Sequence, residues 1–118
     1  MGTVMVTIEV GDPQGSEFRE VELTVDTGST FTALPARMLR ELGVKVDETV
    51  PSDLADGTTT PVDIGWTMVK VEGKTFPTNV IFAGENEPGL LGVVTLEQAL
   101  LAVDPIHGRL VPVNARRY

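Results

Sequence analysis

Asp26 stands at the end of an apolar run and is followed at once by Thr27, Gly28 and Ser29. Burying a carboxylate beside a strand end costs free energy unless nearby donors or a shared proton satisfy it. Thr27 supplies a hydroxyl, and Gly28 lets backbone approach closely or take a positive φ. The four residue types also favour an ordinary turn, so the motif alone leaves a purely structural role open.

Two alternating segments must position Asp26. Residues 3–10 and 18–25 alternate between apolar and polar side chains, which is the period of a half-buried strand. Residues 11–15 between them have strong turn chemistry. We therefore expect an antiparallel hairpin that ends at Asp26.

Residues 34–43 predict a short amphipathic helix. Pro35 suits the first helical position, and Gly43 suits the position just past the end. The apolar side chains between them fall on one face, at Leu34, Met38, Leu39 and Leu42.

From residue 44 to residue 82 the pattern is again typical of strands. Asp56-Gly57 is a hairpin turn signal, and Glu72-Gly73 predicts another. Trp66 lies in the long segment between these turns, and a strand tryptophan is more often a core residue than a ligand platform.

Leu90-Leu91-Gly92 leads into a second predicted helix, and residues 110–113 predict a last strand. Thr95 and Gln98 have the spacing of a capping box, so we expect this helix to begin at Thr95 and run to Leu101.

The string Val25-Asp26-Thr27-Gly28-Ser29 resembles the active-site signature of retropepsin-like aspartic proteases. In that family two apolar residues, a glycine and a short helix follow later, and residues 90–101 match this second mark. Asp56-Gly57 stands where the family carries its flap hairpin. The resemblance covers nearly the whole chain and implies an all-β (mostly) fold. This would be a small, partly closed retropepsin-like barrel with one or two short helices, formed by residues 1–118 as a single domain.

The resemblance also implies a function. The chain has one such motif, so two copies would form a symmetric homodimer, with an Asp26 carboxylate from each copy activating a water to hydrolyse a peptide bond. This aspartic endopeptidase would need no metal and no organic cofactor. Thr27 would brace the two loops across the dimer axis, and Gly28 would offer its backbone to substrate. Substrate contact is expected of Ser29, Asp56, Gly57, Thr58, Leu91 and Gly92. Ser29 is also expected to donate a hydrogen bond to Asp26.

Two positions depart from the viral pattern. Thr30 and Val93 stand where the viral enzymes usually carry an acid and an arginine that support the dimer. A catalytically weak or inactive dimer that binds peptides or proteins therefore remains an alternative, as does a structural β domain with a coincidental turn.

Composition narrows the partners further. The 118 residues include 17 acids and 9 bases, with a net charge of −8 and no cysteine. The negative charge disfavours binding to nucleic acid and to anionic membranes. The absence of cysteine excludes disulfides and thiolate metal sites. Residues 1–10 lack a signal-peptide pattern, so a cytoplasmic location is expected. His107 and Glu87 are interpreted as surface loop residues.

Overall fold

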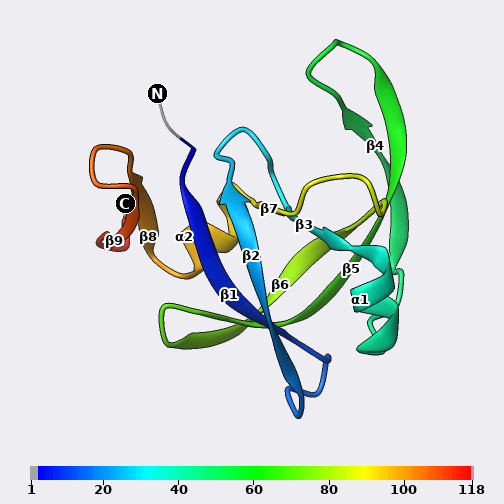
Figure 1. The fold of residues 1–118 in the computed structure, drawn as a ribbon, viewed down its shortest axis with the longest axis horizontal. Helices are drawn as coiled ribbons and strands as arrows, with labels where there is room; N and C mark the ends of the chain where they lie inside the picture. Colours follow the sequence, from blue (N-terminus) through cyan, green and yellow to red (C-terminus); the bar gives the residue numbers. More distant parts are fainter. Residues whose placement is uncertain (1–2, 118) are drawn as a thin grey trace.

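A curled β-sheet forms the body of the protein (Figure 1). The computed structural model describes residues 3–117. In chain order its elements are β1 (Met5–Gly11), β2 (Phe18–Val25), β3 (Thr32–Pro35), α1 (Ala36–Glu41), β4 (Glu48–Asp53), β5 (Thr59–Val71), β6 (Lys74–Ala83), β7 (Leu90–Leu91), α2 (Val93–Gln98), β8 (Leu101–Asp104) and β9 (Arg109–Pro112). The mostly β architecture with two short helices confirms the expected fold class.

The sheet closes on itself into a small barrel. Its strands follow the order β1-β2-β7-β3-β6-β5-β4, and β1 also pairs with β5 through Val10 and Val69. This pairing completes a ring through β1, β2, β7, β3, β6 and β5, while β4 pairs only with the far part of β5. Closure satisfies backbone groups that an open sheet would leave at its edges.

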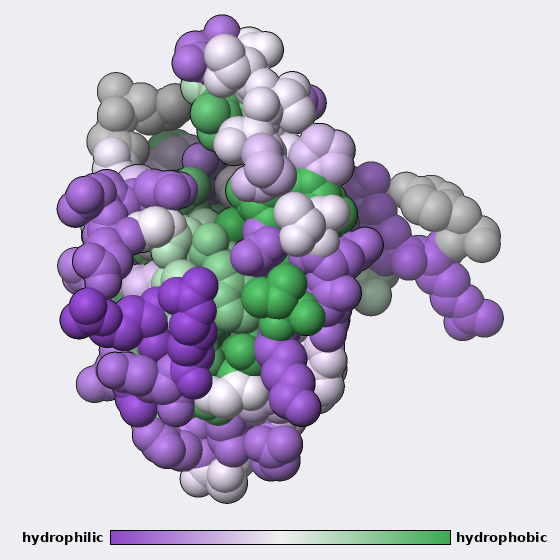
Figure 2. Space-filling view, turned by 90° about the vertical axis from the view of Figure 1, so that its right-hand side faces the viewer, coloured by the Kyte–Doolittle hydropathy of each residue, from purple (hydrophilic) through white to green (hydrophobic). Residues whose placement is uncertain are grey.

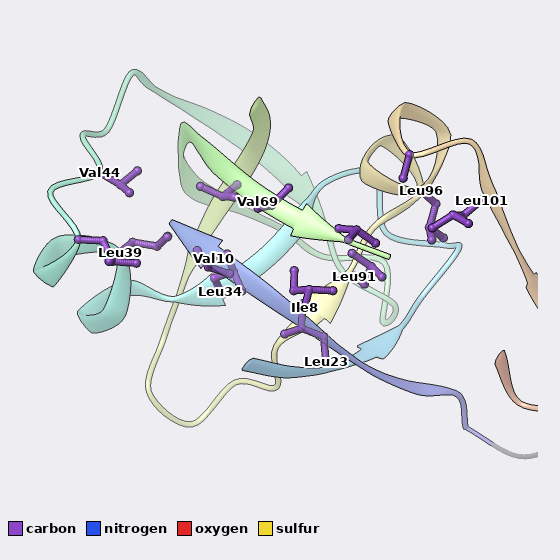
Figure 3. Packing of buried hydrophobic residues seen from close by; sticks show 14 residues of the cluster. Ile8, Val10, Leu23, Leu34, Leu39, Val44, Val69, Leu91, Leu96 and Leu101 are labelled. Atoms are coloured by element: carbon purple, nitrogen blue, oxygen red, sulfur yellow. The ribbon is translucent and has the colours of Figure 1, made fainter. Parts of the chain in front are cut away.

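Side chains from the inner faces of the ring fill the barrel. Those of Val10, Leu23, Leu34, Val69 and Leu91 are completely buried, and Figure 3 shows them meeting in one interior volume. Leu39 of α1 and Leu96 of α2 extend this core on opposite sides of it. Fully burying an aliphatic side chain stabilises a fold by about 1.5–3 kcal/mol, so this core holds the ring closed.

The predicted turns are present. The β1–β2 turn is held by the Asp12 carboxylate, which accepts hydrogen bonds from the backbone N–H groups of Ser16 (2.7 Å) and Glu17 (2.9 Å). Glu72 and Gly73 join β5 to β6 with φ angles of 49° and 79°, as a tight hairpin turn requires.

The long strand β5 takes part in two hairpins. Its first half pairs with β4 and its second half with β6. The β4–β5 hairpin projects beyond the barrel at the upper right of Figure 1, and its turn holds Gly57 at a φ of 87°. The Asp56-Gly57 signal thus predicted this hairpin correctly.

Trp66 does not lie in the core, so that expectation is wrong. On β5 the inward-facing positions are Thr67, Val69 and Val71, each at most 1% exposed. Trp66 has the opposite parity, and 43% of it is exposed. Strand alternation alone could not decide which parity faced inward.

Both helices begin at positions other than those predicted. Helix α1 begins at Ala36 because Pro35 ends β3 and precedes the first helical residue, while Gly43 ends the helix region with a φ of 79°. Helix α2 begins after Gly92 and ends at Gln98, so Thr95 is not its N-cap. Thr95 is instead the third residue of the helix, and its side chain is completely buried.

A one-way chain of hydrogen bonds occupies the space between β3, β6 and α2. Thr78 donates its hydroxyl proton to Gln98 Oε1 at 2.6 Å, so Thr78 must accept from Thr95 at 2.9 Å. Thr95 must then accept from Thr32 at 2.6 Å, and Thr32 accepts from the N–H of Gly92 at 3.1 Å. Each buried hydroxyl donates once and accepts once, and together they anchor α2 to the sheet.

Neither helix within residues 3–117 is long and apolar enough to cross a membrane.

Thr95→Val should destabilise the protein although valine has nearly the same shape as threonine. The substitution leaves the hydroxyl of Thr32 without its acceptor and the hydroxyl of Thr78 without its donor. We expect a loss of about 1–3 kcal/mol in the free energy of unfolding, measured by urea denaturation. Thr75→Val on the exposed side of β6 is the control. Equal stability of both variants would contradict the hydrogen-bond chain.

Candidate active site

The two-residue strand β7 fixes the backbone of Asp26. It lies between β2, with which it is parallel, and β3, with which it is antiparallel. Val25 pairs with Leu91, and the N–H of Asp26 donates to the carbonyl of Leu91 at 3.0 Å. Because Leu91 is completely buried, this bond holds Asp26 where β2 leaves the barrel.

Hydrogen bonds inside the next turn orient the carboxylate. The N–H of Ser29 donates to the Asp26 carbonyl at 3.0 Å, which closes a tight turn. The N–H of Gly28 donates to Asp26 Oδ1 at 2.9 Å. This bond fixes the orientation of the carboxylate within the turn.

Helix α2 supports the turn from behind. The N–H of Val93 donates to the Ser29 carbonyl at 2.8 Å, and that of Val94 to the Thr30 carbonyl at 3.0 Å. The first N–H groups of a helix have no partner within the helix. Here the loop carbonyls satisfy them, so the helix and the Asp26 loop hold each other in place.

Gly92 is required where the loop and α2 meet. A Cβ atom at this position would lie 2.4 Å from the carbonyl carbon of Phe31, closer than real Cβ contacts come. The glycine in Leu90-Leu91-Gly92 therefore serves a close approach of two backbones.

The expected hydrogen bond from Ser29 to Asp26 is not formed. The Ser29 hydroxyl donates instead to the carbonyl of Phe31 at 2.9 Å. A serine hydroxyl carries one proton, and here that proton braces the loop. The backbone N–H of Gly28 takes the role at the carboxylate that we had assigned to Ser29.

The half-buried Asp26 opens onto a cleft of about 750 Å³ beneath the β4–β5 hairpin. Gly28 and Ser29 lie beside it along the same wall. The other lining residues come from β3, from both strands of the hairpin and its turn, from β6, from β7 and from the segment that leads into β7: Ala33, Thr49, Ser52, Asp53, Leu54, Ala55, Thr60, Pro61, Val62, Asp63, Ile81, Phe82, Glu87 and Leu90.

Most of these lining residues were not foreseen. The apolar pattern could assign Val62, Ile81 and Phe82 to strands, but it could not show that these strands border a cleft. An adjoining hollow of about 390 Å³ shares Gly28, Ser29 and Val62 with the cleft.

The other predicted site residues occupy three different places. Asp56, Gly57 and Thr58 form the exposed tip of the hairpin and do not line the cleft of the single chain. Leu91 and Gly92 are buried behind Asp26, so they support the site and are not open to the substrate contact expected of them.

Thr27 is exposed and faces a different surface. It lines a hollow of about 530 Å³ together with Val4, Val25, Val103 and Pro105. Thr27 therefore lies on the side of the Asp26 loop that faces the N-terminal strand and the β8–β9 hairpin.

The hairpin tip has its own electrostatic arrangement. The Asp56 carboxylate accepts hydrogen bonds from the hydroxyl of Thr58 at 2.6 Å and from its N–H at 3.0 Å. These bonds, the hydroxyl first, hold the pKa of Asp56 below its ordinary value of 3.8. The ionised carboxylate thereby keeps the turn hydrogen-bonded in mild acid.

Within residues 3–117, no group of three or more histidines or acids is placed to hold a metal ion. His107 lies 2.7 Å from Asp104 in the exposed turn between β8 and β9. It is a surface loop residue, as the sequence indicated.

Comparison with known proteins agrees with this geometry. Residues 17–98 match the family described as "gag-polyprotein putative aspartyl protease". No curated protein matches the sequence.

Solved structures of retroviral proteases share the fold. The protease of simian foamy virus (mac) has a TM-score of 0.56 and 17% identity, over 83% of this chain and 94% of the viral one. The EIAV protease, solved with the inhibitor HBY-793, has a TM-score of 0.61 and 13% identity, over 83% and 88% of the two chains. The matched segment contains Asp26, the β4–β5 hairpin, β7 and α2, and the chain therefore belongs to the gag-polyprotein aspartyl protease family.

Proposed function

We propose that the protein is an aspartic endopeptidase that works as a homodimer. The observation that carries the proposal is the placement of Asp26, whose carboxylate is held by the N–H of Gly28 at the mouth of a cleft. The cleft has room for a peptide segment, and family membership supplies the reaction class. EIAV protease, which shares the fold, was solved with an inhibitor bound.

A single Asp26 cannot act as both acid and base in this chemistry. Two copies at a symmetry axis would bring two carboxylates close together, where they cannot both ionise at low cost and so share one proton. The ionised carboxylate draws a proton from water as the water attacks the peptide carbonyl, and the protonated one stabilises the developing oxyanion.

The surface around Thr27 is suited to receive the second copy. Thr27 is exposed next to the apolar side chains of Val4, Val25 and Val103. Because Thr27 directly follows Asp26, a partner placed on this surface lies next to the catalytic carboxylate. An isologous interface repeats the arrangement for the second Asp26.

Substrate would lie extended between the Asp26 loop and the β4–β5 hairpin, which acts as a flap. The hairpin extends away from the barrel (Figure 1) and its tip is exposed. An extended peptide can use the backbone groups of the hairpin and the loop on its two sides.

A dimer that binds peptides without useful turnover is the second candidate. Thr30 is exposed and Val93 is half-buried at the positions where viral relatives carry their supporting charges. The Asp26 loop therefore depends on backbone bonds from Val93 and Val94.

Asp26→Asn tests the catalytic proposal. Asparagine keeps the shape but can neither share the proton nor accept one from water, so turnover of a diverse peptide library should fall at least about a hundredfold. Rates are measured between about pH 3.5 and 7.5 at matched high concentration. Wild-type activity should rise more than linearly with concentration while the dimer is partly dissociated.

Equal activity of wild type and Asp26→Asn would remove Asp26 from catalysis. Dimerisation by sedimentation and peptide binding in both proteins, without turnover in either, would favour the binding module.

Thr58→Val tests the hairpin tip. Losing the hydroxyl donor should raise the pKa of Asp56 toward its ordinary value of 3.8. Because the native pKa is lowered, the turn is stabilised above the unfolded pKa and loses that support as pH falls through the folded pKa. Carboxyl carbon NMR titration measures the shift. Thr59→Val, whose hydroxyl bonds Asp53, should leave the pKa of Asp56 unchanged, and an equal shift in both variants would contradict the assignment.

A further inference from the structure

The charged side chains that line the cleft all carry the same sign. Asp26, Asp53, Asp63 and Glu87 lie along it, whereas none of the described lining residues is a lysine, arginine or histidine. Three of these acids come from separate parts of the chain: the end of β4, the middle of β5 and the segment before β7. The negative potential therefore surrounds the cleft and does not belong to one acidic stretch.

Each of the three outer carboxylates has one oxygen engaged by a neighbour. Asp63 Oδ1 accepts from the Thr49 hydroxyl at 2.7 Å, Asp53 Oδ1 from the Thr59 hydroxyl at 3.1 Å, and Glu87 Oε1 from the N–H of Gly84 at 3.1 Å. These bonds orient the carboxylates. None of the ion pairs formed by the described residues involves Asp53, Asp63 or Glu87.

The surface between the carboxylates is apolar. Val62, Ile81, Phe82 and Leu90 line the same cleft, and each is half-buried. Lysine and arginine side chains combine a long aliphatic stem with a charged end. Their stems can pack on this floor while their ends reach a carboxylate, an arrangement that neither an acidic nor a short polar side chain can make.

The nearest basic side chains on the α1 side line a neighbouring hollow and not the cleft itself. Another hollow of about 530 Å³, distinct from the one beside Thr27, shares Asp63 and Phe82 with the cleft and is lined on the α1 side by Arg37 and Arg40. Arg37 is paired with Glu85 at 2.8 Å. Figure 2 shows the face that carries β4 and α1, where hydrophobic surface (green) lies in a hollow between hydrophilic side chains (purple). The hollow on the α1 side thus mixes basic side chains with the acids Glu41, Asp63 and Glu85, whereas the charged residues that line the cleft next to Asp26 are all acidic.

We infer that the cleft selects peptide segments with lysine or arginine close to the scissile bond, and that Asp63 and Glu87 determine this specificity. The part of this inference that concerns cleavage rests on the proposed endopeptidase function. The preference for binding basic peptides does not. In a symmetric dimer the same carboxylates would occur on both sides of the cut, so a basic residue should be favoured on either side.

The test uses three peptides that differ only in a lysine, a glutamine or a glutamate beside the cleaved bond. Wild type should cleave the lysine peptide with a kcat/KM about three- to tenfold above that of the glutamine peptide, with the glutamate peptide slowest. Added salt should reduce the ratio. Similar kcat/KM values for all three peptides would overturn the inference.

Charge-neutral variants locate the preference. Asp63→Asn and Glu87→Gln should each reduce the lysine-to-glutamine ratio by about twofold or more, because each removes one carboxylate from the cleft. Asp47→Asn is the matched control, since Asp47 is an exposed acid outside the cleft lining, and it should keep the wild-type ratio. A ratio that persists in both cleft variants, or that falls equally in the control, would remove the two residues from this role.

Binding separates this inference from the catalytic proposal. Fluorescence anisotropy with the Asp26→Asn protein measures the affinity of the same three peptides. Lysine-selective binding without turnover in wild type would leave the specificity standing and reject the catalysis. Turnover without a charge preference would leave the catalysis standing and reject the specificity. No binding and no cleavage at millimolar peptide would reject the cleft as a peptide site, and the preference with it.

Discussion

The parallel pairing of β7 with β2 is the constraint on which the active site depends. One backbone hydrogen bond, from Asp26 to Leu91, fixes the point where β2 leaves the barrel. Gly92 follows at once and allows α2 to begin against the loop, so that helical N–H groups meet loop carbonyls. The site is thus assembled from backbone groups, and one of them, the N–H of Gly28, holds Asp26 Oδ1 at the mouth of the cleft.

The two sides of the Asp26 loop have different physical characters. Behind it lie buried hydroxyls in a directed chain, with Thr32 and Thr95 completely buried. In front of it lies an open cleft with an apolar floor and carboxylate borders. A buried network rigidifies when every donor and acceptor is satisfied, whereas exposed carboxylates remain available to a ligand. The buried hydroxyls and the carboxylates of the cleft are therefore separate sets of residues.

Local chemistry predicted much of this structure. The β1–β2 hairpin, the turns at Gly57 and Gly73 and the end of α1 at Gly43 follow from turn residues and positive φ, and the Asp26 motif led to the family. Predictions failed where tertiary contacts decide. Thr95 looked like a cap but is buried against Thr32 and Thr78. Nor could alternation reveal which face of β5 is solvated, or which acids would come together around the cleft.

The same pairing has a consequence for the order of events during folding. Val25 and Leu91 are 66 positions apart (91 − 25 = 66). Contacts of such long range close a large loop before any bond offsets the lost chain entropy, which makes them slow to form. On a ribosome the first hairpin emerges early, but Asp26 has no partner for its N–H until β7 has followed. A nascent chain therefore holds an unassembled Asp26 loop, and the cleft beside this loop takes shape only when the barrel has closed.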